Sequence, residues 1–167
     1  MKTNNLFFGL LLFLLIPIYS CSDDNASNTE DLSVAKTMMN VSYGSDSQQV
    51  FDLYLPVNRS STSTKTLILV HGGAWIEGDK VDMNYAVDII KQFLPDYAIA
   101  NVNYRLATTG NYAFPMQIDD IDAIVKKLKV EKYGISDDFG FIGTSAGGHL
   151  SLLYSYGYNS DNNIKMV

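Results

Sequence analysis

The stretch that most constrains this chain is FGFIGTSAGGHL, residues 139–150. Its centre is a G-x-S-x-G pentapeptide that begins at Gly143, ends at Gly147 and follows a short apolar run. In this context the pentapeptide predicts a sharp strand-to-helix turn, which forces the side chain of Ser145 outward and requires small neighbours. The N–H of Ala146, at the start of the helix, would then point to where an oxyanion forms. A match of five residues alone leaves open the alternative that this is a Gly/Ser-rich turn with no catalytic role.

A second motif upstream favours the chemical interpretation. Residues 66–70 are continuously apolar, as expected for a short strand buried on both faces of a parallel sheet. The sequence HGGAW, residues 71–75, follows directly, at the strand end where open α/β sheets place their ligand sites. Its two glycines allow the backbone to turn N–H groups toward a cavity.

The rest of the chain alternates strand and helix patterns. Residues 37–43 and 50–55 alternate apolar and polar side chains around a Gly/Ser/Asp turn, which predicts a hairpin. The other expected elements are an amphipathic helix at 82–94, a buried strand at 97–103, a helix begun by Phe114-Pro115 and a helix after Ser145. Strands separated by helices predict an α/β protein with a mostly parallel central sheet and helices on both faces.

In this order, HGGAW, NYRL at 103–106 and GTSAG resemble the α/β-hydrolase fold. The most similar group is the esterases and lipases with an HGG oxyanion loop, within them the carbohydrate-esterase-like branch that removes acetyl or feruloyl groups. Kynurenine-formamidase-like enzymes share HGG-x-W and G-x-S-A-G, so an amide substrate stays open. The resemblance implies hydrolysis of a small-molecule or polysaccharide-linked ester, without cofactor or metal.

The resemblance also implies roles for individual residues. Ser145 would be the nucleophile that carries the acyl-enzyme. His71 would brace the loop, and Arg105 would be a structural ion-pair partner. Trp75 would either line the substrate pocket or fill space. The residues expected around the substrate are the oxyanion donors Gly73, Ala74 and Ala146 and the substrate-binding Gly72 and Trp75.

The acid and base of this family are expected after the serine, in the order Ser, Asp or Glu, His. Only 22 residues follow Ser145, and they contain His149 and Asp161 but no later histidine. Asp161 lies too close to Ser145 in sequence to be the expected acid. The side chain of His149, on the helix that follows the serine, is expected to point away from that helix rather than over the serine hydroxyl. We therefore expect the amino-terminal part of a hydrolase, truncated after the elbow helix, in which the elbow strand 139–143 becomes an apolar, unprotected edge.

The amino terminus reads as an export signal. Lys2 precedes a 13-residue apolar run, and the only cysteine, Cys21, follows it. This resembles a bacterial lipoprotein signal, which implies a signal peptide at 1–20, lipidation of Cys21 and a Gram-negative envelope or cell-surface location. An ordinary signal peptide with a stray cysteine is the alternative. We expect a polar tether at 21–36 and the hydrolase domain at 37–167.

Charge narrows the partners. The net charge is −6 and the basic residues are scattered, which argues against nucleic acid as a partner. Three hypotheses remain: a lipid-anchored serine esterase, a decayed or non-catalytic fragment, and a lipoprotein binding module that kept the fold without the chemistry.

Overall fold

The computed structural model describes residues 30–131 and 133–167, so the predicted signal peptide and Cys21 lie outside the described residues. Contacts divide the chain into two units, Met1–Glu30 and Asp31–Val167. The second unit contains the sheet and its helices. It begins at Asp31, within the segment expected to be a tether, because Arg59 binds residues of that segment. Its backbone N–H donates to Leu32 O (3.1 Å) and its Nη1 to Val34 O (2.6 Å).

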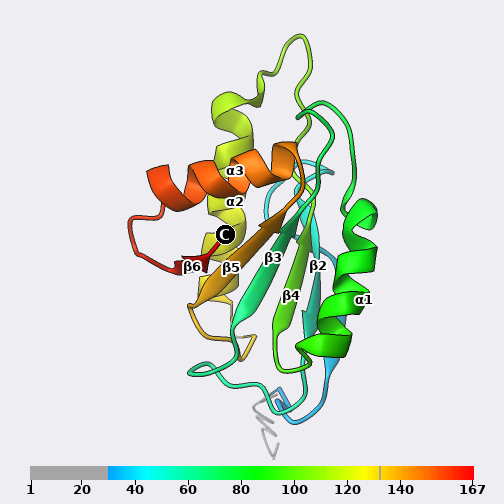
Figure 1. Ribbon diagram of the computed structural model, residues 1–167, viewed down its shortest axis with the longest axis vertical. Coiled ribbons are helices and arrows are strands. Elements are labelled where there is room, and N and C mark those ends of the chain that lie inside the picture. The colour runs from blue at the N-terminus through cyan, green and yellow to red at the C-terminus, as the bar shows by residue number, and fades with distance from the viewer. Residues whose placement is uncertain (1–29, 132) are drawn as a thin grey trace, which may run out of the picture. The chain divides into compact units, whose positions relative to one another are not determined.

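A six-stranded mixed sheet, in the order β1-β2-β4-β3-β5-β6, forms the centre of this unit (Figure 1). The first three strands in this order pair antiparallel, and β4, β3, β5 and β6 run parallel to one another. The strands are β1 (Lys36–Ser42), β2 (Val50–Leu55), β3 (Thr66–Val70), β4 (Ala98–Val102), β5 (Phe139–Gly143) and β6 (Ile164–Met166). The predicted hairpin and buried strands are thereby confirmed.

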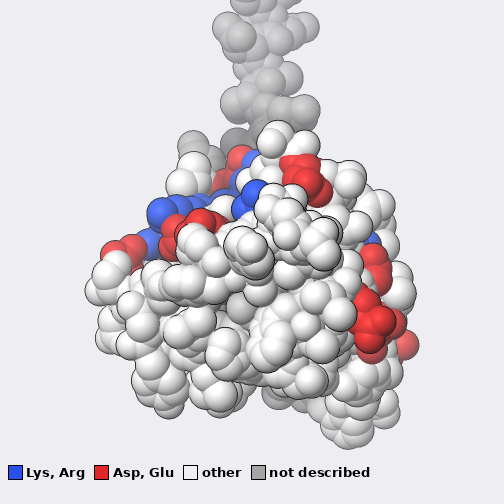
Figure 2. Space-filling view, turned by 90° about the horizontal axis from the view of Figure 1, so that it is seen from above, with Lys and Arg blue, Asp and Glu red and all other residues white. Residues whose placement is uncertain are grey.

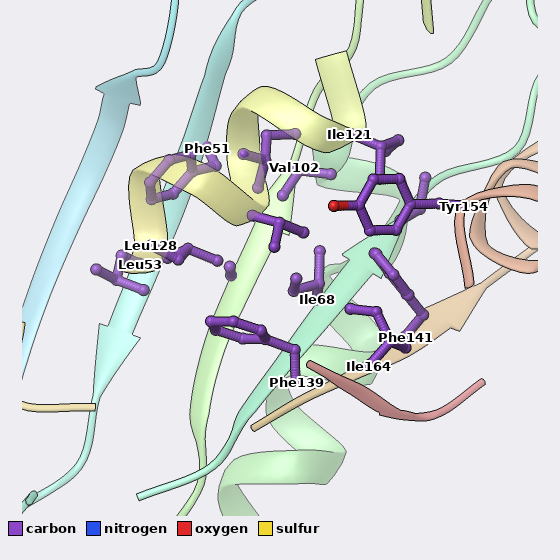
Figure 3. Close-up of a cluster of buried hydrophobic side chains, with 14 of the residues drawn as sticks. Phe51, Leu53, Ile68, Val102, Ile121, Leu128, Phe139, Phe141, Tyr154 and Ile164 are labelled. Atoms are coloured by element: carbon purple, nitrogen blue, oxygen red, sulfur yellow. The ribbon is translucent and has the colours of Figure 1, made fainter. Parts of the chain in front are cut away.

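Helices cover both faces of the sheet. They are the 3-10 helix η1 (Lys80–Met83) and the α-helices α1 (Asn84–Phe93), α2 (Ala113–Val130) and α3 (Ala146–Gly157). Against one face, α2 and α3 bury the larger core, which includes Ile121, Tyr154 and Phe141 (Figure 3). Against the other face, η1 and α1 bury a smaller core around Leu69 and Val87.

The apolar patterns of the sequence explain these layers. β3 and β4 are buried at every position because helices lie on both sides of them. The expected apolar face of α2, spaced three and four residues apart, is buried at every predicted position: Ile118, Ile121, Val125 and Leu128. The helix expected at 82–94 is divided, since Asp79 forms a capping box with Asp82 and begins the separate 3-10 turn η1.

The predicted edge position of β5 is wrong in part. The chain returns after α3, and β6 pairs in parallel with the first half of β5, with Ile164 opposite Phe139 and Met166 opposite Gly140. The side-chain oxygen of Asn159 fixes this return, because it accepts hydrogen bonds from the backbone of residues 163 and 164. In the part of the chain that the structure describes, β6 covers β5 only at residues 139 and 140.

Candidate active site

Ser145 lies at a strained turn between β5 and α3. Its backbone has φ 49° and ψ −116°, in the left-handed half of φ space that costs a residue with a side chain about 1–3 kcal/mol. The turn is held by hydrogen bonds from Thr144 N to Val70 O (3.1 Å) and from Gly147 N to Thr144 O (2.9 Å). Ser145 is exposed, as expected for a side chain that such a turn directs outward.

The small residues around this turn are required by close backbone contacts. A Cβ on Gly147 would lie 2.2 Å from Val70 O, and one on Gly143 would lie 2.5 Å from Gly147 O. A Cβ on Gly72 would meet Ser145 Cβ at 3.3 Å. The last contact shows that the HGGAW loop lies directly beside the serine, although the two are more than 70 positions apart in sequence.

The HGGAW loop turns its backbone through three consecutive residues with positive φ: Gly73 at 111°, Ala74 at 50° and Trp75 at 68°. The carbonyl of Gly73 accepts hydrogen bonds from the N–H groups of Ile76 and Glu77, both at 3.0 Å. Within residues 30–131 and 133–167, the N–H groups of Gly73, Ala74 and Ala146 donate to no acceptor. Unpaired N–H groups beside an exposed serine are what an oxyanion hole requires.

His71 braces the loop from below. It is fully buried, its ring stacks on Tyr104 with centroids 4.3 Å apart, and its Nδ1 donates to Gly72 O (2.6 Å). Tyr104 Oη donates to His71 O (2.9 Å), and burial raises the pKa of this hydroxyl to about 12, which keeps it a donor. Burial lowers the pKa of His71, which favours the neutral ring. These contacts support the expected bracing role.

Gln117 holds the outer end of the loop. Its Nε2 donates to Trp75 O (2.7 Å) and to Arg105 O (2.8 Å), and Ala107 N donates to the same Trp75 oxygen (2.8 Å). Sequence reasoning missed Gln117 and Tyr104. The available signal for Gln117 was its position four residues before Ile121, on the buried face of α2.

Arg105 is an ion-pair partner, as predicted. Its guanidinium binds the fully buried Asp120 of α2 through Nη2 at 2.6 Å and Nε at 3.0 Å. The backbone N–H of Arg105 donates to the same carboxylate (2.8 Å), and so does Gln49 Nε2 (2.8 Å). This carboxylate therefore fixes the end of β4 against α2.

The two titratable candidates that follow the serine in sequence, His149 and Asp161, have other partners. The His149 ring meets Trp75 edge to face at 5.4 Å, and Asp161 pairs with Lys129 at 2.5 Å. Among the described residues, no side-chain hydrogen bond involves Ser145 Oγ. Trp75 is 37% exposed beside the serine, which fits a wall of the substrate site better than a buried filler.

The charged side chains at the end of the sheet that carries this site lie away from the centre of that face (Figure 2). Figure 2 shows the end of the molecule toward which β3 and β5 run in Figure 1, and its centre carries no Lys, Arg, Asp or Glu.

Residues 30–131 and 133–167 contain no group of three or more His, Cys, Asp or Glu side chains that could hold a metal ion. No helix in those ranges is long and apolar enough to cross a bilayer.

An exposed serine at a strained strand-to-helix turn, beside loop amides at the ends of parallel strands, defines the α/β-hydrolase class. Its solved neighbours bear this out. Esterase B from Lactobacillus rhamnosis superimposes with a TM-score of 0.59 at 29% identity, over 77% of this chain and 41% of that one. The chain belongs to the BD-FAE family, whose signature matches residues 51–166.

Curated relatives are esterases and deacylases. Rabbit (Oryctolagus cuniculus) arylacetamide deacetylase is 28% identical over 98% of this chain, and Mycobacterium tuberculosis esterase LipC is 31% identical over 68%. A truncated carbohydrate esterase from gut microbiota superimposes with a TM-score of 0.59 at 27% identity, over 75% of this chain and 45% of that one. This chain spans 39% of the rabbit protein's length and 28% of the mycobacterial one.

Proposed function

We propose that this chain carries the nucleophile and oxyanion hole of a serine carboxylic-ester hydrolase. The observation that carries the proposal is the exposed, backbone-strained Ser145 beside the unengaged N–H groups of Gly73, Ala74 and Ala146. Strain and unpaired donors are costly to keep in a folded protein, and they persist where a function uses them.

The chemistry is acyl transfer in two steps. Ser145 Oγ attacks the ester carbonyl, its proton passes to a general base, and the carbonyl oxygen becomes an oxyanion held by the three N–H groups. The intermediate collapses, and the base returns the proton to the departing alkoxide, which leaves as the alcohol. Water, deprotonated by the same base, then attacks the acyl-enzyme and releases the carboxylic acid and free Ser145. Removal of one oxyanion donor raises the barrier by about 3 kcal/mol.

Neither the general base nor its acid partner is found among the described residues around Ser145. His149 packs on Trp75 and Asp161 pairs with Lys129, so neither is assigned here. We propose that both groups belong to a part of the protein that corresponds to the unmatched length of its relatives.

The substrate that we favour is an acylated carbohydrate or another small ester. One support is the similarity to the gut carbohydrate esterase. The other is the uncharged centre of the site face, the end of the molecule shown in Figure 2, which suits a neutral acyl ester. An amide hydrolase is the second candidate, because zebrafish (Danio rerio) kynurenine formamidase is 27% identical over 72% of this chain.

Steady-state kinetics on the complete gene product test the proposal. We expect hydrolysis of nitrophenyl acetate, acetylated xylan or methyl ferulate, and a loss in kcat of at least about 10³-fold in Ser145→Ala. Ser155→Ala is the matched control, since Ser155 lies on the same helix. Among the described residues its hydroxyl binds only Ser151 O. Faster turnover of N-formylkynurenine than of every ester would favour the amide candidate. Equal hydrolysis by wild type and Ser145→Ala would contradict Ser145 as the nucleophile. No hydrolysis by the wild type would favour the decayed or non-catalytic alternatives.

We also propose that the protein is exported and lipidated on Cys21. The support is the apolar run that ends at Ile18, three residues before the single cysteine. Metabolic labelling with an alkynyl fatty acid should mark the wild type, and the mark should be absent from Cys21→Ser. Release of unmodified wild-type protein into the periplasm would contradict the anchor.

A further inference from the structure

Beneath the oxyanion loop lies a buried ion pair that touches neither the serine nor the substrate site. Lys80 Nζ lies 2.7 Å from Asp52 Oδ2, and the two residues are only 7% and 3% exposed. The rest of the network is built around them from β1, β2, β4 and the loop itself. We propose that Lys80 and Asp52 are positioning residues that hold the oxyanion loop in its donor-presenting conformation, an inference that rests on the proposed function.

The network fixes the segment directly after the loop at several points. Lys80 N donates to Asn103 Oδ1 (2.5 Å), and Asn101 Nδ2 donates to Lys80 O (2.8 Å). Asn103 Nδ2 donates to Asp79 Oδ2 (2.8 Å). Both backbone polar groups of Lys80 and the side chain before it are therefore bound to β4 and to the residue that follows it.

Asp52 connects this segment to the antiparallel part of the sheet. Its second oxygen, Oδ1, accepts from the backbone N–H of Asn40 (2.8 Å), at the point where β1 departs from regular pairing with β2. In β2 it lies opposite Asn101 of β4. The Asp52 carboxylate therefore connects β1 and β2 to Lys80, which lies directly after the oxyanion loop.

The loop transmits this anchoring to the oxyanion donors because it is short and closed. A Cβ on Gly78 would lie 2.6 Å from both Gly72 O and His71 Nδ1, and one on Gly73 would lie 1.9 Å from Glu77 O. The two ends of the loop are thus in contact with each other. A shift of residues 78–80 must displace Gly73, whose N–H is a proposed oxyanion donor.

A buried ion pair is weak evidence for stability, since apolar replacements of such pairs are often neutral or stabilising. A role in holding one loop conformation explains better why a lysine and an aspartate are buried at this place. The alternative is an ion pair that contributes to folding alone. The two differ in what happens to the loop when the pair is removed from a protein that remains folded.

The test follows Trp75, the single tryptophan of residues 1–167, which lies in the loop itself. Acrylamide quenching of Trp75 fluorescence and hydrogen exchange of residues 72–78 are compared among wild type, Lys80→Met and Asp52→Asn/Lys80→Met. The matched control is Lys126→Met, because the Lys126–Asp122 pair lies within α2 and its lysine side chain is 72% exposed. Lys80→Arg tests rescue by a retained charge.

We expect the Trp75 quenching constant to rise about twofold in Lys80→Met and in the double variant, as a side chain now 37% exposed becomes mostly exposed. Exchange at residues 72–78 should accelerate, whereas Lys126→Met should match the wild type. In the complete gene product, kcat should fall about 10- to 100-fold with KM little changed, because small displacements of transition-state donors have costs of that order.

The outcomes separate this inference from the proposed function. If Trp75 and the loop amides change but no hydrolysis is detected in any variant, the positioning inference stands and the esterase proposal fails. Wild-type quenching and exchange in a folded Lys80→Met or double variant would overturn the inference. If Lys80→Met does not fold, the charge-free double variant decides. If that also does not fold, the pair serves folding alone and the inference is overturned.

Discussion

At residue scale, Gly147 shows how little room the serine turn leaves. A methyl group there would lie 2.2 Å from Val70 O and 2.4 Å from His71 O, both backbone atoms that cannot rotate away. We therefore expect Gly147→Ala to lower the free energy of unfolding by about 1–3 kcal/mol or more, as overpacking does. Urea unfolding followed by circular dichroism measures this loss.

Gly157→Ala is the control, on the same helix. Its added Cβ would meet only Leu153 Cδ1, at 3.9 Å, so this variant should be as stable as the wild type or more stable by up to about 1 kcal/mol. Equal stability of the Gly147 and Gly157 variants would contradict the close packing described for the turn.

The buried imidazole of His71 makes stability depend on pH. Burial lowers its pKa, so below the unfolded value of about 6.5 the unfolded chain takes up a proton that the folded chain resists. The free energy of unfolding should therefore decrease as the pH falls from 7 toward 5, and it should be unaffected by this group above 7. His71→Gln should flatten the slope. An unchanged slope in denaturant titrations at several pH values would show that His71 is not the group responsible.

At the scale of elements, the Asp120 carboxylate joins β4 to α2. It is fully buried and accepts from Arg105 and Gln49, whereas Asp119 beside it is exposed. Asp120→Ala should destabilise the protein by about 2–4 kcal/mol, because it leaves the partly buried guanidinium unpaired. Asp119→Ala should change stability by about 0.5 kcal/mol or less. Chemical denaturation of the two variants side by side measures the contrast, and equal losses would count against the described role of Asp120.

Most elements could be predicted because their signals are local. The apolar run 66–70 predicts a strand that is buried on both faces. The spacing of apolar residues from Ile118 to Leu128 predicts a helix and identifies its buried face. The turn around Ser145 was also readable, since G-x-S-x-G is a local steric requirement.

Long-range polar contacts were not readable in the same way. Nothing in the local sequence indicates a partner for Asp120, yet it pairs with Arg105, fifteen residues away. The Lys80–Asp52 pair spans 28 positions, and the return of β6 to β5 depends on the side chain of Asn159. Partners this far apart in sequence meet only in the folded chain, so no periodicity in the sequence predicts them.

At the scale of the whole molecule, charge should influence which esters react. The chain has a net charge of −6, and the site face is uncharged at its centre. A neutral nitrophenyl ester should therefore have a higher kcat/KM than an anionic ester of similar size, and added salt should narrow the difference by screening. Measurement of both esters across a salt series tests this, and a preference for the anionic ester that persists at high salt would contradict it.

The central claim is that Ser145 is a nucleophile that faces an oxyanion hole. Treatment of the complete gene product with a fluorophosphonate probe, followed by peptide mapping, tests it directly. We predict one adduct on Ser145 and none in Ser145→Ala. An unlabelled Ser145 in folded protein, or an adduct that persists elsewhere in Ser145→Ala, would contradict the claim.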